Sequence, residues 1–519
     1  MREHARSPPI KPFRVHFRPV KSVVDSRTET KGGYRHGARE RNMRYRKRRA
    51  VTAVAVISLF SGMALSTTPL PSGSFAMLES SMSCPADGSG AQTTCYMTNP
   101  AQALKVVTNL QTSGVEYFMI PSATLDEAEV LATAIDSRSA KFLSMERWTL
   151  DPAINTTTGE FDCNAYTESR IKPFLLPLKT HHPESFVGLQ LKDEAAQPEH
   201  TNLGALVACV RKQPALADLK MFVNLAPVNA NDVSLYVPNP PQGAAGAISP
   251  PDFGVDCATN TIVDRSKLNA MTNRYTSFVI SALDNIKPDY IAYDLYPFNG
   301  ALSSCTVARE QLMTANASII AQQATVRGVV PITYLQNYQK AVPTGSPTEP
   351  QHASFRDLRW YSAWFYAFGG RGTANFISHD EGVNFGMLDA NNNPRDIAVE
   401  QESVFGFTRQ VQDSLKGYDY VDFLAPWLGV PSGALVGWLP SQDIMASEFS
   451  NKVSGTDIVV FVTRPNGPVS PTPTGLNKWR TKVEKLNFGT GLWETVGQST
   501  NAITVDFGDL PAAVYRLSD

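Results

Sequence analysis

From Asn99 onward, short apolar runs alternate with longer stretches whose apolar residues recur at helical spacing, and this alternation constrains the fold more than any other feature. The apolar runs predict seven strands, at 115–120, 140–145, 186–194, 220–227, 289–298, 329–337 and 372–380. The helical stretches lie between them, at 99–114, 124–135, 202–212, 271–286, 311–324 and 358–370. Strands that alternate with helices in this way predict parallel βαβ units.

An eighth strand would close these units into a barrel, and the segment around 93–97 is a candidate for it. The alternative is an open doubly wound sheet, but the chain lacks the glycine-rich phosphate loop that usually follows the first strand of such a sheet. The sequence therefore predicts an α/β fold of the (β/α)8 TIM barrel type. The Pro- and Gly-rich stretch 237–254 reads as a loop on the rim, where barrel active sites lie.

Near the C-terminus the helical patterns stop. Short strand-like runs at 456–464, 482–489, 491–497, 502–508 and 512–517 are separated by turn residues. This pattern predicts a small antiparallel β-sandwich at 441–519, after a barrel at 77–440.

The N-terminal region differs from the rest in charge. The first 50 residues contain 16 Lys and Arg against 4 Asp and Glu, so residues 51–519 carry a net charge of −13. An acidic body argues against nucleic-acid binding and against docking on anionic lipid. Residues 1–42, rich in Arg, Pro and polar residues, are interpreted as a disordered extension or a mis-called start, with Met43 as the alternative start.

Residues 43–76 have the pattern of a secretory signal peptide, in which a cationic cluster runs directly into an apolar stretch. That stretch is shorter than the roughly 20 residues that span a bilayer, and small residues at 64–66 and 74–76 are candidate cleavage sites. We therefore expect a secreted or cell-envelope protein with no membrane span after cleavage. Its six cysteines can form up to three disulfides, with Cys84–Cys95 the easiest local pair.

Two adjacent carboxylates, Asp193 and Glu194, follow the apolar run Val187–Leu191. In a barrel the carboxyl ends of the strands carry the active site, so both side chains are expected at its mouth. Their mutual repulsion raises the pKa of at least one of them, which makes it a candidate proton donor. The alternative is that Asp193 caps the next helix and Glu194 is a solvated acid in its first turn.

Acids, amides and aromatic side chains also follow the other predicted strands, and this combination suits a sugar, because polar groups bind hydroxyls and flat rings stack on pyranose faces. The candidate substrate-binding residues are Asp193, Glu146, Trp148, Asn224, Tyr296, Gln336, Asp380 and Glu381, and Asp294 is a further candidate acid. His379 beside Asp380 and Glu381 raises the alternative of Zn or Mn, but no second histidine has ligand spacing. We therefore expect neither a metal nor a cofactor.

Four motifs, GLQLKDE at 188–194, MFVNLAP at 221–227, PDYIAYDLYPF at 288–298 and GGRGTANFISH at 369–379, resemble those of clan-A-like glycoside hydrolases, the beta-galactosidase or cellulase-type TIM barrels of exported bacterial proteins and their poorly characterised relatives. The resemblance extends from about residue 115 to the C-terminus. It implies a barrel followed by a small β domain, and a carbohydrate as the substrate or bound glycan.

The resemblance also implies catalytic positions. The general acid/base of that clan is a Glu at the end of the fourth strand, which corresponds to Glu194 if one strand precedes 115–120. Its nucleophile is a Glu at the end of the seventh strand, where this chain has Gln336. An amide cannot form the glycosyl ester of a retaining mechanism. The proline that commonly follows the Asp-Glu pair is Ala195 here.

The leading hypothesis is therefore an exported glycoside hydrolase in which Glu194 is the general acid and Asp294 the second carboxylate. Asp380 and Glu381 are alternatives for the second carboxylate. A separation of ~6.5–9.5 Å from Glu194 would permit an inverting mechanism. The competing hypothesis, motivated by Gln336, is a non-catalytic carbohydrate-binding or cell-envelope protein on a degenerate glycosidase barrel. A purely structural surface protein is a third possibility.

Overall fold

The computed structural model describes a central α/β region and a C-terminal β region of the chain. The described residues are 74–77, 95–121, 124–146, 153–155, 157–238, 240–241, 243–298, 302, 304–340, 353–379, 384–425, 433–439, 441, 443–464 and 470–519. The predicted extension at 1–42 and most of the predicted signal peptide at 43–76 lie outside them.

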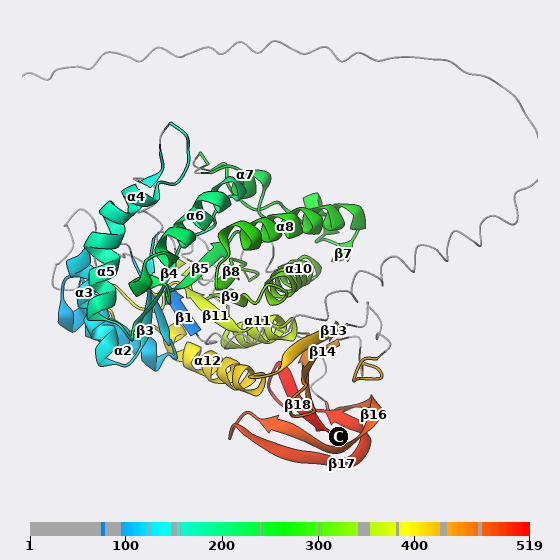
Figure 1. The fold of residues 1–519 in the computed structure, drawn as a ribbon. Helices are drawn as coiled ribbons and strands as arrows, with labels where there is room; N and C mark the ends of the chain where they lie inside the picture. Colours follow the sequence, from blue (N-terminus) through cyan, green and yellow to red (C-terminus); the bar gives the residue numbers. More distant parts are fainter. Residues whose placement is uncertain are drawn as a thin grey trace, which may run out of the picture. The chain divides into compact units, whose positions relative to one another are not determined.

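Eight parallel strands of the described residues form a closed barrel in the order β1-β11-β9-β8-β5-β4-β3-β2 (Figure 1). In chain order they are β1 (Ser74–Met77), β2 (Tyr117–Ile120), β3 (Lys141–Met145), β4 (Phe186–Gln190), β5 (Lys220–Leu225), β8 (Tyr290–Tyr293), β9 (Val330–Gln336) and β11 (Gly372–Phe376). The seven strands expected from the sequence are confirmed. The eighth strand lies before Asn99, as expected, but its expected position at 93–97 is wrong, because residues 96–98 form a turn before a helix, and β1 closes the barrel instead.

Helices surround the strands and include all six that the sequence predicts. They are α2 (Pro100–Thr112), α3 (Leu125–Ser137), α4 (Cys163–Tyr166), the π-helix η2 (Thr167–Leu175), α5 (Leu176–His181), α6 (His200–Arg211), α7 (Asp232–Tyr236), α8 (Arg265–Ile286), α10 (Thr306–Thr325), α11 (Phe355–Ala367) and α12 (Asp396–Ser414). Short 3-10 helices lie at Gln197–Glu199, Pro214–Leu216 and Pro250–Phe253. The predicted caps are present: Asn99 accepts from the first turn of α2, and Thr124 and Glu127 form a capping box on α3.

The direction of each barrel side chain follows from the two-residue period of a strand. The barrel centre is filled by one cluster of buried side chains, Met119, Leu143, Met145, Phe222, Tyr290, Ala292, Ile332, Tyr334 and Ala374. The residues between them, such as Val223 and Ile291, pack outward against the helices. A residue two positions after the last of these inward side chains on its strand therefore also points inward, at the carboxyl end of the barrel.

The C-terminal region is a six-stranded antiparallel sheet in the order β13-β14-β15-β18-β16-β17 (orange to red in Figure 1). Its strands are β13 (Asp419–Leu424), β14 (Ile444–Asn451), β15 (Thr456–Thr463), β16 (Thr472–Asn487), β17 (Leu492–Val505) and β18 (Ala512–Ser518). The expected antiparallel β region is thus confirmed, and its strands are hydrogen-bonded in one continuous order. The sheet curls around its own core, in which Leu476 of β16 and Ile503 of β17 pack with Ile444 of β14.

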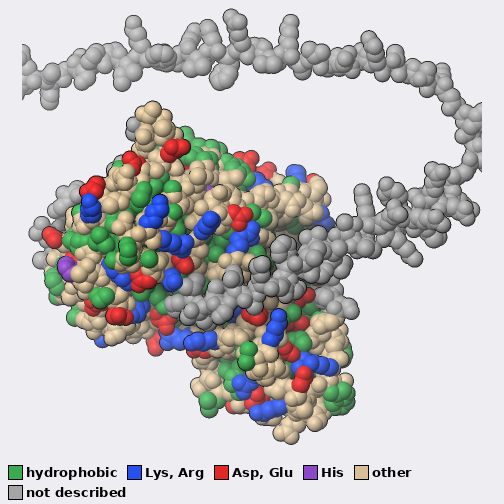
Figure 2. All heavy atoms as spheres, viewed as in Figure 1, with side chains coloured by type: hydrophobic (Ala, Val, Ile, Leu, Met, Phe, Trp, Pro, Cys, Tyr) green, Lys and Arg blue, Asp and Glu red, His purple; other side chains and the backbone are tan. Residues whose placement is uncertain are grey.

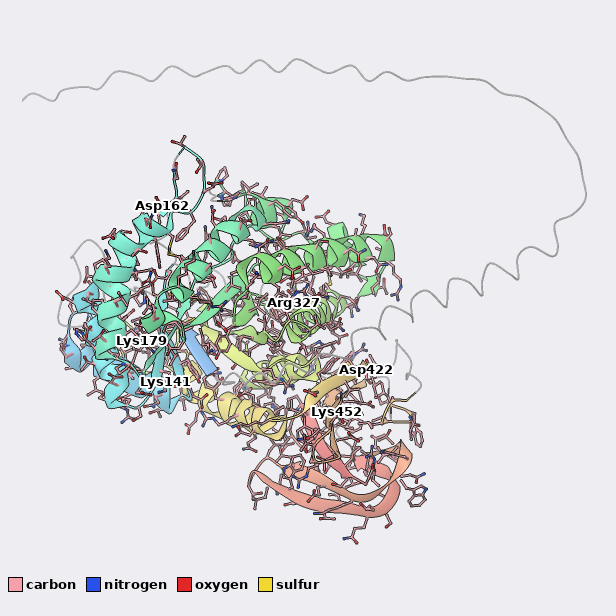
Figure 3. All side chains as sticks on the ribbon, viewed as in Figure 1. Lys141, Asp162, Lys179, Arg327, Asp422 and Lys452 are labelled. Atoms are coloured by element: carbon pink, nitrogen blue, oxygen red, sulfur yellow. A yellow bond between two sulfur atoms is a disulfide. The ribbon has the colours of Figure 1, made fainter. Side chains whose placement is uncertain are left out.

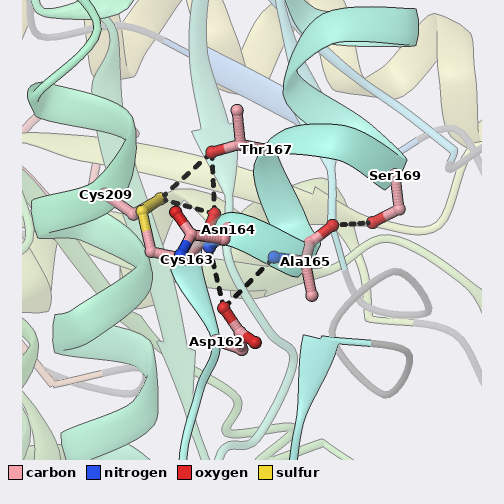
Figure 4. Close-up of a disulfide and its surroundings, with 7 residues drawn as sticks. All are labelled: Asp162, Cys163, Asn164, Ala165, Thr167, Ser169 and Cys209. Carbon is pink, nitrogen blue, oxygen red and sulfur yellow. Dashed lines mark hydrogen bonds between the residues drawn. A yellow bond between two sulfur atoms is a disulfide. The ribbon is translucent and has the colours of Figure 1, made fainter.

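Two disulfides tie the outer helices and loops together. Cys163 at the start of α4 is bonded to Cys209 in α6, beside the Asp162 side chain that caps α4 (Figure 4). Cys257 is bonded to Cys305, the residue that precedes α10. Cys95 is also disulfide-bonded. Its expected partner Cys84 lies outside the described residues.

Figure 2 shows basic and acidic side chains interspersed over one face of the molecule. At the amino ends of the strands, Lys141 and Lys179 donate to backbone carbonyls at 183–186 and so fasten the turn before β4 (Figure 3). No helix among the described residues is both long enough and apolar enough to cross a membrane.

Candidate active site

Asn224 of β5 joins two predicted acids, which follow β4 and β8, the strands on either side of β5. Its Nδ2 donates to Asp193 Oδ1 and to Asp294 Oδ2, each at 2.7 Å. Asn224 is fully buried and lies two residues beyond the inward-facing Phe222, so its amide is fixed at the carboxyl end of the barrel interior. Since an amide group carries two hydrogens, one hydrogen is available for each carboxylate. The two accepting oxygens are therefore at most about 5.4 Å apart, twice the length of one bond.

Tyr296 completes the contacts of Asp294. Its hydroxyl donates to Asp294 Oδ1 at 3.0 Å, so each oxygen of this carboxylate accepts a hydrogen bond. The Tyr296 ring stacks on Phe376 with centroids 5.7 Å apart and meets Tyr338 edge-on at 5.3 Å. These three rings form an aromatic wall beside the carboxylates. Such a wall suits a flat, partly apolar ligand face.

The electrostatics of the site favour a protonated Asp294. Burial raises the pKa of Asp294 well above its ordinary value, and the negative charges of Asp193 and then Glu194 raise it further. The hydrogen bonds from Asn224 and Tyr296 act in the opposite direction but are smaller effects. Burial, followed by the Asp294 charge, also raises the pKa of the Tyr296 hydroxyl well above 10, so this hydroxyl remains a donor.

Glu194 is exposed, unlike its neighbour Asp193, which is partly buried. Its backbone has a φ of 47°, in the left-handed region that non-glycine residues seldom occupy. Glu194 is near enough for its charge to raise the pKa of Asp294 and of the buried Tyr275. The three expected acids therefore form one electrostatic cluster, in which hydrogen bonds through Asn224 link Asp193 with Asp294.

Gln336 lies at the end of the seventh strand, as expected, and is fully buried. Its Oε1 accepts a hydrogen bond from the backbone N–H of Phe298 at 3.0 Å. Since Phe298 is two residues beyond Tyr296, this bond fastens the loop that carries Asp294 and Tyr296. Gln336 therefore supports the site through the backbone of that loop.

Glu146 has a different environment from the one expected. It is fully buried and accepts from Arg170 Nε at 3.0 Å and Nη2 at 2.9 Å, from the Tyr166 hydroxyl at 2.8 Å and from Ser144 at 2.9 Å. Met145 faces the barrel centre, so Glu146 has the outward direction. The structure thus places Glu146 between β3 and the π-helix η2, with its charge paired.

Three other candidates, Trp148, Asp380 and Glu381, lie outside the described residues. His379 is buried, stacks on Tyr96 with centroids 4.8 Å apart, and has its Nε2 3.0 Å from Asn392 Oδ1. Within the described part of the chain, no group of three or more His, Cys, Asp or Glu side chains is arranged to hold a metal ion.

Gln190, the last residue of β4, was not among the residues predicted from the sequence. Leu189 and Leu191 pack outward, so Gln190 faces the barrel interior, where it is only 2% exposed. The signal was available in the sequence, because Gln190 is a polar residue within an apolar run and lies three residues before Asp193.

The chain matches no protein-family model and no curated protein in sequence. Among solved structures, it resembles a chain described as a glycoside hydrolase, with 8% identity, 86% of this chain and 93% of that chain covered, and a TM-score of 0.49. It also resembles the noncanonic maltogenic alpha-amylase AmyB of Thermotoga neapolitana, at 8% identity with 85% and 98% covered and a TM-score of 0.43.

A third similar structure is a GH99 endo-alpha-mannosidase from Bacteroides thetaiotaomicron, at 8% identity with 66% and 98% covered and a TM-score of 0.37. All three TM-scores are below 0.5, so these likenesses assign no activity to this chain. The function must be inferred from the residues at the barrel mouth.

Proposed function

We propose that this protein is an exported glycoside hydrolase on a (β/α)8 barrel with a C-terminal β-sandwich-like domain, and that Asp193 and Asp294 are its catalytic carboxylates. The observation that carries the proposal is the shared hydrogen bonding of both acids to Asn224. The disulfides Cys163–Cys209 and Cys257–Cys305 support export, because such bonds persist in oxidising compartments.

In this proposal Asp294 is the general acid, because its pKa is raised and it keeps a proton to donate to the leaving oxygen. Asp193 then carries the negative charge and attacks the anomeric carbon. The upper limit of about 5.4 Å between the two accepting oxygens lies below the ~6.5–9.5 Å of inverting glycosidases and so favours the retaining class, whose carboxyl groups are ~5–5.5 Å apart.

The two steps balance as in any retaining hydrolysis. Asp193 forms an ester with the sugar while Asp294 protonates the departing alcohol. Asp294, now a carboxylate, takes a proton from water, whose oxygen attacks the anomeric carbon and releases Asp193. Tyr296 and Asn224 hold the Asp294 carboxylate in place during both steps.

This assignment gives Glu194 a different role from the one first expected. Glu194 remains in the cluster as the exposed carboxylate whose charge helps to keep Asp294 protonated. Asp193 is linked to Asp294 by hydrogen bonds through Asn224, which is the reason for its assignment as the nucleophile.

The test is hydrolysis of a panel of aryl glycosides and polysaccharides by the purified protein. We expect Asp294→Asn and Asp193→Asn to lower kcat by roughly 10²-fold or more, and Glu194→Gln to retain most of the activity. Sodium azide should restore turnover to Asp193→Ala and yield a glycosyl azide, because azide replaces the missing nucleophile. An active Asp193→Asn variant would contradict the assignment.

The alternative, a carbohydrate-binding protein without catalysis, is supported by one observation. Gln336 occupies the end of the seventh strand, and its Oε1 accepts a hydrogen bond from the Phe298 backbone N–H. This alternative predicts that the wild type binds glycans on an array without releasing reducing sugar. Sugar release that is lost in Asp294→Asn would exclude it.

A further inference from the structure

The barrel interior contains unsatisfied polar atoms directly beneath the acid cluster. Neither amide atom of Gln190 has a hydrogen-bond partner among the described residues, and neither does Asn224 Oδ1. The exposed fraction is 2% for Gln190 and 0% for Asn224. A buried polar group without a partner is energetically costly, so such atoms normally meet a ligand or water.

The strand register places the Gln190 side chain near that of Asn224. Gln190 of β4 is level with Phe222 of β5, and Asn224 lies two residues further along β5 on the same inward face. One two-residue repeat is about 6.6 Å, so Gln190 lies about that much deeper than the amide that holds Asp193 and Asp294. The side chains level with it, Met145 and Phe222, are apolar.

A hydroxyl group would match the hydrogen-bonding needs of both side chains, because it both donates and accepts. It can donate to Asn224 Oδ1 and accept from Gln190 Nε2. In a hexopyranoside bound with its anomeric carbon between Asp193 and Asp294, the exocyclic hydroxymethyl group extends further from the ring than any ring hydroxyl. We propose that Gln190 and Asn224 bind this hydroxymethyl group, so that Gln190 selects hexopyranosides over pentopyranosides.

This inference rests on the proposed function for the position of the sugar, but its test requires binding only. The probes are three sugar pairs whose members differ by the hydroxymethyl group: D-glucose and D-xylose, D-galactose and L-arabinose, and D-mannose and D-lyxose. The measurement is the rise of the thermal unfolding midpoint of the full chain with sugar concentration, up to about 100 mM.

We expect one hexose to stabilise the wild type at a concentration roughly tenfold or more below that needed for its pentose partner. Gln190→Leu should remove this preference, because leucine keeps the volume and loses both polar atoms. Gln190→Glu, which loses the amide donor, should weaken it as well. Hydrolysis assays run in parallel show separately whether the catalytic proposal holds.

The matched control is Gln401→Leu. Gln401 in α12 is also fully buried, and both of its amide atoms also have no partner among the described residues, but it packs in the outer helical layer. It should change the midpoint without sugar and leave the hexose preference intact. The inference is overturned if no hexose is preferred by the wild type, or if Gln190→Leu behaves like Gln401→Leu, since Gln190 would then contact buried water only.

Discussion

Asp193 and Asp294 accept hydrogen bonds from a single amide group, that of Asn224, each at 2.7 Å. The two carboxylates come from different strand ends, and the buried amide fixes their separation. Their charges are therefore coupled, and burial together with this coupling keeps a proton on Asp294.

Glu194→Gln should move the alkaline limb of the kcat/KM profile to lower pH. The Glu194 charge is one of the causes that raise the Asp294 pKa, so its removal lowers that pKa and the proton is lost earlier as pH rises. The measurement is a pH–rate profile on an aryl glycoside. Asp218→Asn, which changes an acid paired with Lys179, is the control and should leave the limb in place. A shift of the limb to higher pH would contradict the prediction.

Glu146→Gln should destabilise the fold by about 3–5 kcal/mol, because it leaves the buried guanidinium of Arg170 without its counter-charge. The exposed pair Glu168–Lys172 provides the control, and Glu168→Gln should cost at most about 0.5 kcal/mol. Urea unfolding measures both. If Glu146 instead contacts substrate, the variant would show a raised KM with an unchanged free energy of unfolding.

Gly204→Ala should destabilise the barrel by roughly 1–3 kcal/mol, since the new Cβ would lie 2.0 Å from the Asn285 backbone oxygen, where α6 and α8 approach each other. Gly406 offers the opposite case within a helix. A Cβ there meets nothing within 4 Å, so Gly406→Ala should stabilise by about 0.5–1 kcal/mol. Thermal unfolding of the two variants should shift in opposite directions, and equal shifts would refute the close approach.

His200 should make the protein less stable as the pH falls. Burial lowers its pKa from 6.5 to about 4, so the unfolded chain binds a proton that the folded chain does not. Above pH 6.5 the His200 side chain is neutral in both states and does not lower the free energy of unfolding. As the pH falls from 6.5 to about 4, protonation of the unfolded chain lowers the free energy of unfolding by about 3 kcal/mol in total. Measured over that range, the free energy of unfolding should fall less in His200→Leu than in the wild type. Parallel curves would contradict this.

If the protein is exported as proposed, the N-terminus of its mature chain should lie before Ser74. Ser74–Met77 form β1, which pairs with both β2 and β11, so cleavage after Ala76 would remove most of the strand that closes the barrel. Cleavage at 64–66 leaves it whole. N-terminal sequencing of protein secreted by a bacterial host tests this, and a mature chain that starts at Met77 would be the contrary result.

The sequence predicts the barrel well because each buried strand is a distinct apolar run. The exception is β1, whose four residues Ser-Phe-Ala-Met are too few to show a period and follow directly after a region with a signal-peptide pattern. Helix α12 was not predicted, although its buried residues Ile397, Val404 and Val411 recur at helical spacing.

Part of the site was also predictable, because polar and aromatic residues at the ends of apolar runs can be read directly from the sequence. Asn224, Asp294 and Tyr296 were found as polar and aromatic residues at strand ends, and the structure brings them together with Asp193. Successive side chains of a strand point to opposite faces. Because Met145 faces the barrel centre, Glu146 points outward, which the expectation of a substrate-binding Glu146 did not take into account. The bond from Phe298 to Gln336 depends on a contact between strands that no local pattern contains.

The position of β1 also determines when the molecule can finish folding. Ser74 pairs with Thr373, so the first strand to emerge during synthesis or export waits for a neighbour that follows about 300 residues later. Until then β1 has an exposed edge, and the ring of strands stays open. A chain of this topology therefore completes the carboxyl end of its barrel only when its last strand arrives.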